Sequence, residues 1–257
     1  MRILFVGDIF GKPGLRTLNA LLPEMKRVNR VDLVIANGEN SASGFGVTTG
    51  TAREMFSAGV DVITTGNHVW DRREIMEKID DMPRLLRPAN LAPPVPGNGW
   101  CVVEAAGLRV AVINLVGRVF MDPVDCPFRT ADSVLRDLKD MSPDAIVVDF
   151  HAEATSEKQA LGHYLDGRVS AIVGTHTHVP TADARTLPGG TAFISDVGMT
   201  GVLDSIIGLD RDRITQRFLT GMPVSAPQAQ GRGMLCGALI EIEKNRNILR
   251  RIDAFEP

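Results

Sequence analysis

Side chains of the types that bind metal ions recur along the chain, each at or just after a short apolar run typical of a buried strand. They are Asp8, Glu39, Asn40, Asn67, His68, His151, His176 and His178. These residues come from five separate segments. Because ligands bind at the carboxyl ends of the strands in a sheet covered by helices, the side chains are expected to converge on one site.

Each residue taken alone also has an ordinary structural interpretation. Asp8 could cap a following helix, Asn67 could hold a tight turn, and a lone histidine is more often a packed or surface group. The combination favours a site, because four of the five histidines follow predicted strands. His176 and His178 also stand at i and i+2, a spacing that directs both side chains to one side only in extended backbone.

The chemistry of the set is coherent. Imidazole, carboxylate and carboxamide groups form a mixed nitrogen and oxygen environment that suits Fe, Mn or Zn and disfavours soft copper. Two such ions about 3.5–4 Å apart can share a hydroxide, bring its pKa towards neutrality and clamp a phosphoryl group. The residues therefore predict a metal-dependent hydrolase that acts on a phosphate ester.

These motifs resemble the sequence blocks of the calcineurin-like metallophosphoesterases. The blocks are Gly7-Asp8, Gly66-Asn67-His68, His151 and the segment 174–178. Two positions depart from that superfamily: Phe10 stands where a histidine is usual, and Glu39-Asn40 stands where Gly-Asp is usual. The same departures, together with the segments 66–71 and 151–158, resemble the bacterial YmdB-like phosphodiesterases over nearly the whole chain.

The resemblance implies a fold, a ligand set and a substrate. The fold is α/β, a four-layer αββα sandwich of two mixed β-sheets flanked by helices. The first metal ion would be held by Asp8, Glu39, Asn40 and His178, and the second by Glu39, Asn67, His151 and His176. Glu39 would bridge the ions, which are expected to be Fe, with Mn or Zn as alternatives. The substrate class is a small phosphate diester, above all a 2′,3′-cyclic nucleotide.

The catalytic step implied by the resemblance is attack of a metal-bridging hydroxide on phosphorus, with His68 as the general acid. An alkoxide leaving group needs an acid that works near neutral pH, which imidazole provides. The alternative interpretation of His68 is a hydrogen-bonded turn residue beside Asn67. Asp149 or Glu153 could orient a ligand histidine.

Two further residues are candidates for substrate binding. Phe45, between two glycines, could stack on a base, although a glycine-rich loop is usually only a turn. Arg118 could contact phosphate oxygens, with a surface salt bridge as the alternative.

Two rival functions use the same residues. A phosphomonoesterase such as a nucleotidase would need the same metals, because selectivity lies in the loops around them. A regulatory protein that binds nucleotide or RNA could keep the metals for structure. A closed structural site, however, has no need of a spare acid such as His68.

The elements that must position these residues follow from hydrophobic periodicity. Apolar runs alternate with segments of helical period, as in a sheet with helices on its faces. Helices are expected at 13–28, 131–138 and 156–165, with a capping box at Thr51 and Glu54. Strands are expected at 3–6, 33–36, 60–64, 101–104, 109–115, 145–150, 169–174, 191–195, 234–243 and 248–255, the last two joined by a turn at 244–247.

Composition and charge limit the remaining choices. The chain has 257 residues, 44% of them hydrophobic, which predicts a single packed domain over residues 1–257. A net charge of -3 provides no broad cationic field for duplex nucleic acid. No apolar run is long enough for a membrane span, and no signal-peptide pattern precedes the first strand, so a cytoplasmic location is expected. Assembly into a homo-oligomer is left open.

Overall fold

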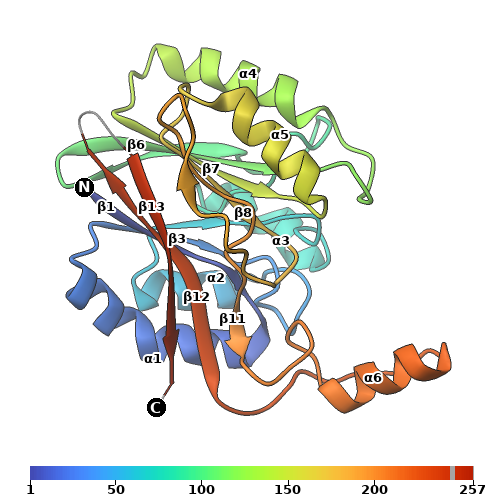
Figure 1. Ribbon diagram of the computed structural model, residues 1–257. Coiled ribbons are helices and arrows are strands. Elements are labelled where there is room, and N and C mark those ends of the chain that lie inside the picture. The colour runs from blue at the N-terminus through green and yellow to red at the C-terminus, as the bar shows by residue number, and fades with distance from the viewer. Residues whose placement is uncertain (244–246, 257) are drawn as a thin grey trace.

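Alternate residues of the inner strands face two different hydrophobic layers, because successive side chains of a strand point to opposite faces of its sheet. In the first strand, Leu4 and Val6 face one buried cluster, while Ile3 and Phe5 face another. The structure is a computed structural model that describes residues 1–243 and 247–256. Its three buried clusters separate four layers, helix, sheet, sheet and helix (Figure 1).

The first sheet mixes parallel and antiparallel strands. Its order is β2-β11-β12-β1-β3-β4, with β13 paired to β12. Strands β1, β3 and β4 run parallel, whereas β12 is antiparallel to both β1 and β13. The strands are β1 (Arg2–Val6), β2 (Asp8–Ile9), β3 (Leu33–Asn37), β4 (Val62–Thr64), β11 (Met199–Val202), β12 (Gly233–Ile242) and β13 (Asn247–Phe255).

The second sheet has the order β5-β6-β7-β8-β10-β9. The hairpin β5/β6 is antiparallel, and β6, β7, β8 and β10 run parallel to one another. The strands are β5 (Trp100–Ala105), β6 (Leu108–Val116), β7 (Ala145–His151), β8 (Ala171–Thr175), β9 (Arg185–Thr186) and β10 (Ala192–Ile194).

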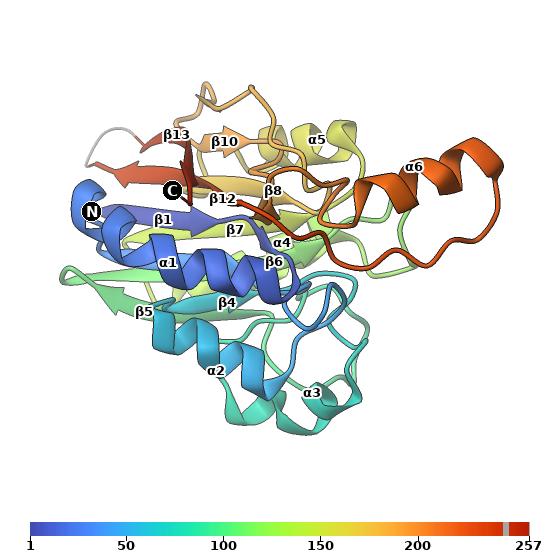
Figure 2. The same cartoon turned by 90° about the horizontal axis from the view of Figure 1, so that it is seen from below.

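Helices cover the outer face of each sheet. Helices α1 (Gly11–Asn29) and α2 (Thr49–Ala58) pack on the first sheet, and α4 (Pro127–Lys139) and α5 (Thr155–Leu165) on the second. The α3 helix (Arg73–Lys78) and a short 3-10 turn (Ile79–Asp81) follow β4. The α6 helix (Arg211–Thr220) projects away from the sandwich (Figure 2). No helix in the described part of the chain is long and apolar enough to cross a membrane.

The predicted fold class is confirmed, with local differences. Helix α4 begins at Pro127, earlier than expected, because proline is well suited to the first helical position. The capping prediction was wrong by one turn: Thr48 is the N-cap of α2, and Thr51 completes its capping box. The hairpin β12/β13 forms as predicted, and residues 244–246 of its turn lie outside the described residues. Elements β2, β9, β11 and α6 were not predicted.

Candidate metal centre and its cavity

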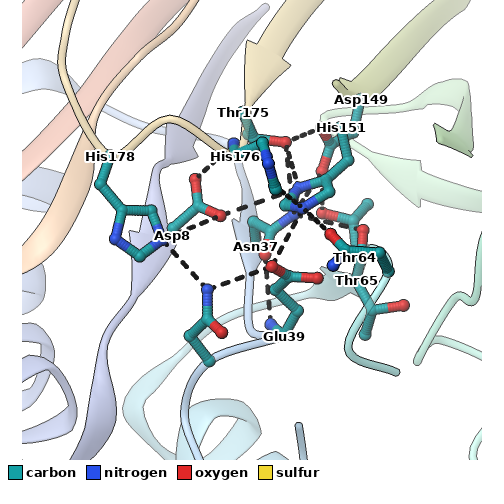
Figure 3. Close-up of polar contacts among 12 residues, drawn as sticks. Asp8, Asn37, Glu39, Thr64, Thr65, Asp149, His151, Thr175, His176 and His178 are labelled. Carbon is teal, nitrogen blue, oxygen red and sulfur yellow. Dashed lines mark hydrogen bonds and ion pairs between the residues drawn. The ribbon is translucent and has the colours of Figure 1, made fainter. Parts of the chain in front are cut away.

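The predicted ligands lie at the carboxyl ends of strands from both sheets. Asp8 follows β1, Glu39 and Asn40 follow β3, and Asn67 and His68 follow β4. His151 is the last residue of β7, and His176 and His178 follow β8. Figure 3 shows the side chains of five of these residues meeting with those of their supporting neighbours. The sequence predicted this convergence, but not that two sheets would share it.

The Nε2 atom of His151 is the centre of one group of ligand atoms. It lies 3.0 Å from Glu39 Oε1, 3.1 Å from Asn67 Oδ1 and 2.9 Å from His176 Nδ1. A single N–H can donate to only one of these three acceptors. Glu39, His151 and His176 offer ligand atoms within 4.8 Å of one another. A cation would satisfy all of these atoms, so the donor set fits a metal ion.

A second group of atoms surrounds Asp8. Its Oδ1 is buried and has no hydrogen-bond partner among the residues that the structure describes, and it lies 3.8 Å from His151 Nδ1 and 3.9 Å from His178 Nε2. Asn40 Nδ2 lies 3.1 Å from His178 Nε2 and donates to Glu39 Oε1 over 3.1 Å. A buried carboxylate oxygen with no partner is costly unless a cation or donor meets it. This oxygen is a second sign that the site fits metal.

Each of the three histidines has its outward nitrogen bonded and its other nitrogen turned inward. His178 Nδ1 donates to Ile207 O over 3.0 Å, and His176 Nε2 lies 3.1 Å from Glu153 Oε2. His151 Nδ1 lies 2.9 Å from Thr175 Oγ1. Metal-binding histidines characteristically use the outward N–H in this way, which fixes the ring and leaves the inward nitrogen free for the ion.

A chain of buried polar groups determines the tautomer of His151. The Thr175 hydroxyl donates to Asp149 Oδ1 over 2.7 Å, so it must accept from His151 Nδ1–H. Asn37 donates to Asp149 Oδ2 over 3.0 Å, and Thr64 donates to the same oxygen. Asp149 therefore orients His151 through Thr175. Sequence reasoning named Asp149 for this role but missed Asn37, Thr64 and Thr175, since ordinary buried polar residues within strands give no signal.

The segment of residues 176–178 has an unexpected backbone. The i, i+2 spacing predicted extended structure, but His176 has φ 100° and His178 has φ 65°. Both values lie in the left-handed region, which is unfavourable for residues other than glycine and occurs where surrounding contacts enforce it. The enforcing contacts are at Thr177, whose amide and hydroxyl both donate to Asp196 Oδ2, over 3.1 Å and 2.8 Å.

Charge is unevenly shared among the buried groups. Burial opposes ionisation of both partners, but their mutual attraction raises the pKa of His151 to about 9 and lowers that of Glu39 to about 2. Burial and the charge of His151 lower the pKa of His176 to about 3. Burial also raises the pKa of Asp8. In the absence of metal, the site therefore favours a proton on His151 and a neutral His176.

His68 lies beside the ligand groups with a partner of its own. Its Nδ1 is 2.8 Å from Asp71 Oδ2, and its backbone amide donates to Glu39 Oε2 over 3.3 Å. The ring of Phe45 packs against it edge to face, at 5.2 Å between centroids. A hydrogen bond from Nδ1–H to Asp71 leaves Nε2 as the atom able to carry a transferable proton.

A cavity of about 340 Å³ opens over these residues. Its polar lining comprises Glu39, Asn40, His68, Glu153, His176, Thr177 and His178, and its apolar lining comprises Phe10, Gly44, Phe45, Ile207 and Leu209. Phe45 thus lines the cavity, as its predicted role in substrate binding requires. Arg118 is exposed and does not line this cavity, and its amide donates to Glu157. Sequence reasoning missed Ile207 and Leu209, which sit in a loop without any recognisable motif.

The structure of an NAD nucleotidase from Haemophilus influenzae aligns with a TM-score of 0.63 at 14% identity, over 98% of this chain and 55% of that chain. At this identity the likeness concerns the fold alone. The two-sheet sandwich is therefore a fold that this chain shares with that nucleotidase.

The chain belongs to the YmdB-like protein family, whose model matches residues 4–255. A 2′,3′-cyclic-nucleotide 2′-phosphodiesterase of Bacillus subtilis (strain 168) is 50% identical over 243 residues, which cover 95% of this chain and 92% of the relative. A crystal structure described as a novel phosphatase of Mycoplasma pneumoniae aligns with a TM-score of 0.92 at 32% identity, over 100% of this chain and 94% of that chain. The family resemblance inferred from the motifs is confirmed.

Proposed function

We propose that the chain is a phosphodiesterase that hydrolyses 2′,3′-cyclic nucleotides at a centre of two metal ions, with His68 as the general acid. The observation that carries the proposal is the cavity that joins His68 to the inward-facing atoms of Glu39, His176 and His178. The name of the Bacillus subtilis relative supports the substrate class. Fe is the expected metal, with Mn or Zn as alternatives.

The two groups of atoms described above support a division of the ligands. Asp8, Asn40 and His178 would hold one ion, Asn67, His151 and His176 the other, and Glu39 would bridge them. Glu39 suits this role because its Oε1 contacts both His151 Nε2 and Asn40 Nδ2. For Asn40 to ligate, its amide would have to turn so that the oxygen takes the place of Nδ2.

When bound, the metal ions would supply the nucleophile at neutral pH and offset the charge of the phosphoryl group. Proton transfer and the orientation of the ligands would depend on residues of the chain. His68 Nε2 would protonate the leaving oxygen, with Asp71 holding the ring in the required orientation. Glu153, bonded to His176 Nε2, would keep that ring turned inward. Removal of a general acid of this kind typically lowers kcat about 10²–10⁴-fold.

A phosphomonoesterase is the second candidate, favoured by the description of the Mycoplasma pneumoniae structure as a phosphatase. The metal ligands do not separate the two activities, because they act on the phosphoryl centre alone. A regulatory protein with structural metals fits less well. His68 and its Asp71 partner line an open cavity, whereas a structural ion is enclosed by its ligands.

The test compares the purified protein with Glu39→Gln and His68→Ala on 2′,3′-cyclic AMP and on adenosine 3′-monophosphate. His163→Ala is the matched control, because His163 lies exposed on α5, outside the cavity. We expect cleavage of the cyclic ester by the wild type and the control, with large losses in the other two. Turnover of only the monophosphate would favour the second candidate, and full activity of His68→Ala would remove the acid from the proposal.

Metal analysis of the untreated protein decides between Fe, Mn and Zn and gives the number of ions per chain. Two ions per chain are expected. A single domain over residues 1–257 and a cytoplasmic location also remain predictions, and self-assembly remains open. Gel filtration with light scattering measures the last of these.

A further inference from the structure

The ring of Phe10 holds two loops of the cavity in place. A Cβ atom added at Gly44 would lie 2.9 Å from Phe10 Cζ, and one added at Gly208 would lie closer still to the same ring. Both glycines have left-handed backbones, with φ 93° and 97°. Only glycine allows this close approach. Phe10, which stands where the wider superfamily has a histidine, therefore acts as a packing platform for both loops.

Each of these glycines has an exposed apolar neighbour that lines the cavity. Phe45 follows Gly44 and is 48% exposed, and Ile207 precedes Gly208 and is 49% exposed. Ile207 has φ 47°, a genuine outlier for a β-branched residue. Its carbonyl accepts the hydrogen bond from His178 Nδ1, so a proposed metal ligand fixes its position. Phe45 is similarly placed by its contact with His68.

Phe45 and Ile207 thus stand beside two different polar groups of the site, His68 and His178. A phosphate bound near these groups would bring the rest of its ester next to the apolar lining. Half-exposed apolar side chains on strained or glycine-built loops are costly to maintain, which indicates a ligand-binding role. Aromatic stacking on a base is worth about 1–3 kcal/mol per base and tolerates any base, since each has a π-face.

We propose that Phe45, Ile207 and Leu209 form a slot for the nucleobase of the substrate, and that this slot does not select among bases. The inference rests on the proposed function and extends it from the phosphate to the whole mononucleotide. Base selection requires hydrogen-bonding side chains against the base, and the three side chains of the slot carry none. The single-nucleotide size agrees with a cavity of about 340 Å³.

The experiment measures kcat/KM for 2′,3′-cyclic AMP, 2′,3′-cyclic CMP and 1-O-methylribose 2′,3′-cyclic phosphate, which lacks a base. The informative quantity is the ratio of the value for cyclic AMP to that for the ester without a base. Any disturbance of His68 caused by changing Phe45 affects both substrates and cancels in this ratio. Stacking predicts that Phe45→Ala lowers the ratio about tenfold or more, mainly through KM.

Three further variants sharpen the test. Phe45→Trp should retain the ratio, because it keeps an aromatic face, and Ile207→Ala should lower it less than Phe45→Ala does. Phe218→Ala is the matched control, because Phe218 is 80% exposed on α6 and does not line the cavity. It should leave the ratio unchanged. All three positions are exposed, so the variants should melt close to the wild type.

If Phe45→Ala keeps the wild-type ratio of kcat/KM values, the proposed nucleobase slot is wrong. If kcat/KM differs a hundredfold between the adenine and cytosine esters, the slot does select among bases. If the wild type cleaves none of the esters, the proposed function fails, and calorimetric binding of adenosine 3′-monophosphate still tests the slot. Equal affinity of wild type and Phe45→Ala for that nucleotide would then reject it.

Discussion

Lys158 and Asp196 form a buried ion pair next to the segment that carries two histidines of the proposed metal centre. Lys158 Nζ lies 2.7 Å from Asp196 Oδ2, and the two side chains are 2% and 1% exposed. The same oxygen accepts both bonds from Thr177, and Asp196 Oδ1 accepts from Gly198 N over 2.8 Å. Asp196 therefore joins α5 to the strained loop that carries His176 and His178.

Replacement of Lys158 should damage both stability and the site. Lys158→Met leaves the Asp196 carboxylate buried without its counter-charge, a change that typically costs about 3–5 kcal/mol. Chemical denaturation measures this loss of unfolding free energy. Because the histidine loop loses its support, metal affinity should also fall by about 10- to 100-fold, the usual effect of removing a residue that supports a ligand.

The matched control for Lys158→Met is Leu22→Ala. Leu22 is fully buried in the layer between α1 and the first sheet, so this variant loses stability without touching the loop. Metal affinity unchanged in Leu22→Ala but reduced in Lys158→Met supports a positioning role. Equal metal affinities in the two variants would show that the ion pair contributes to stability alone.

Metal binding should stabilise the folded chain. The unpartnered Asp8 Oδ1 and the crowded acceptors around His151 Nε2 are unfavourable without a cation. A ligand that binds only the folded state adds about 2.7 kcal/mol when present at 100 times its Kd. Differential scanning fluorimetry of EDTA-treated protein should show Tm rising with added Mn²⁺. Glu39→Gln should lose most of this rise, and an undiminished rise would contradict the ligand assignment.

The Asp71 carboxylate should matter for catalysis through His68. In Asp71→Asn, the group that accepts the hydrogen bond from His68 Nδ1–H loses its negative charge and orients the ring less firmly. The kcat for the cyclic ester should therefore fall, but by less than in His68→Ala. Asp71 is bonded to His68, which is not one of the proposed ligands, so metal content should stay at the wild-type level. A loss of metal from Asp71→Asn would show that Asp71 supports the structure of the site and does not act through His68 alone.

Asp183 should make stability depend on pH on the acid side. Although burial opposes it, hydrogen bonds from the Ser195 and Thr181 hydroxyls lower the pKa of Asp183 below its ordinary 3.8. A carboxyl whose folded pKa is depressed contributes stability above the unfolded pKa and loses it as pH falls through the folded value. Asp183→Asn should therefore lower Tm at pH 7, and the difference from wild type should shrink below about pH 4. A difference independent of pH would exclude this charge effect.

The local pattern of the chain was sufficient for most elements and for the choice of ligand residues. Buried strands such as β1 and β7 stand out because their apolar runs are short and continuous, and the following polar residues mark the strand ends. Short elements escaped prediction. Strands β2 and β9 have two residues each, too few for any period, and of the residues of α6 only Ile214 is buried.

Chain order and residue type thus determined which side chains would meet, because parallel strands deliver their carboxyl ends to a common edge. The relative positions of these side chains were decided only by the packing of the two sheets. The left-handed backbone at His176 and His178, the relay from Asp149 to His151 and the apolar slot at Ile207 all depend on contacts between residues far apart in sequence. Such contacts leave no local periodicity, because their energy exists only once both sheets are in place.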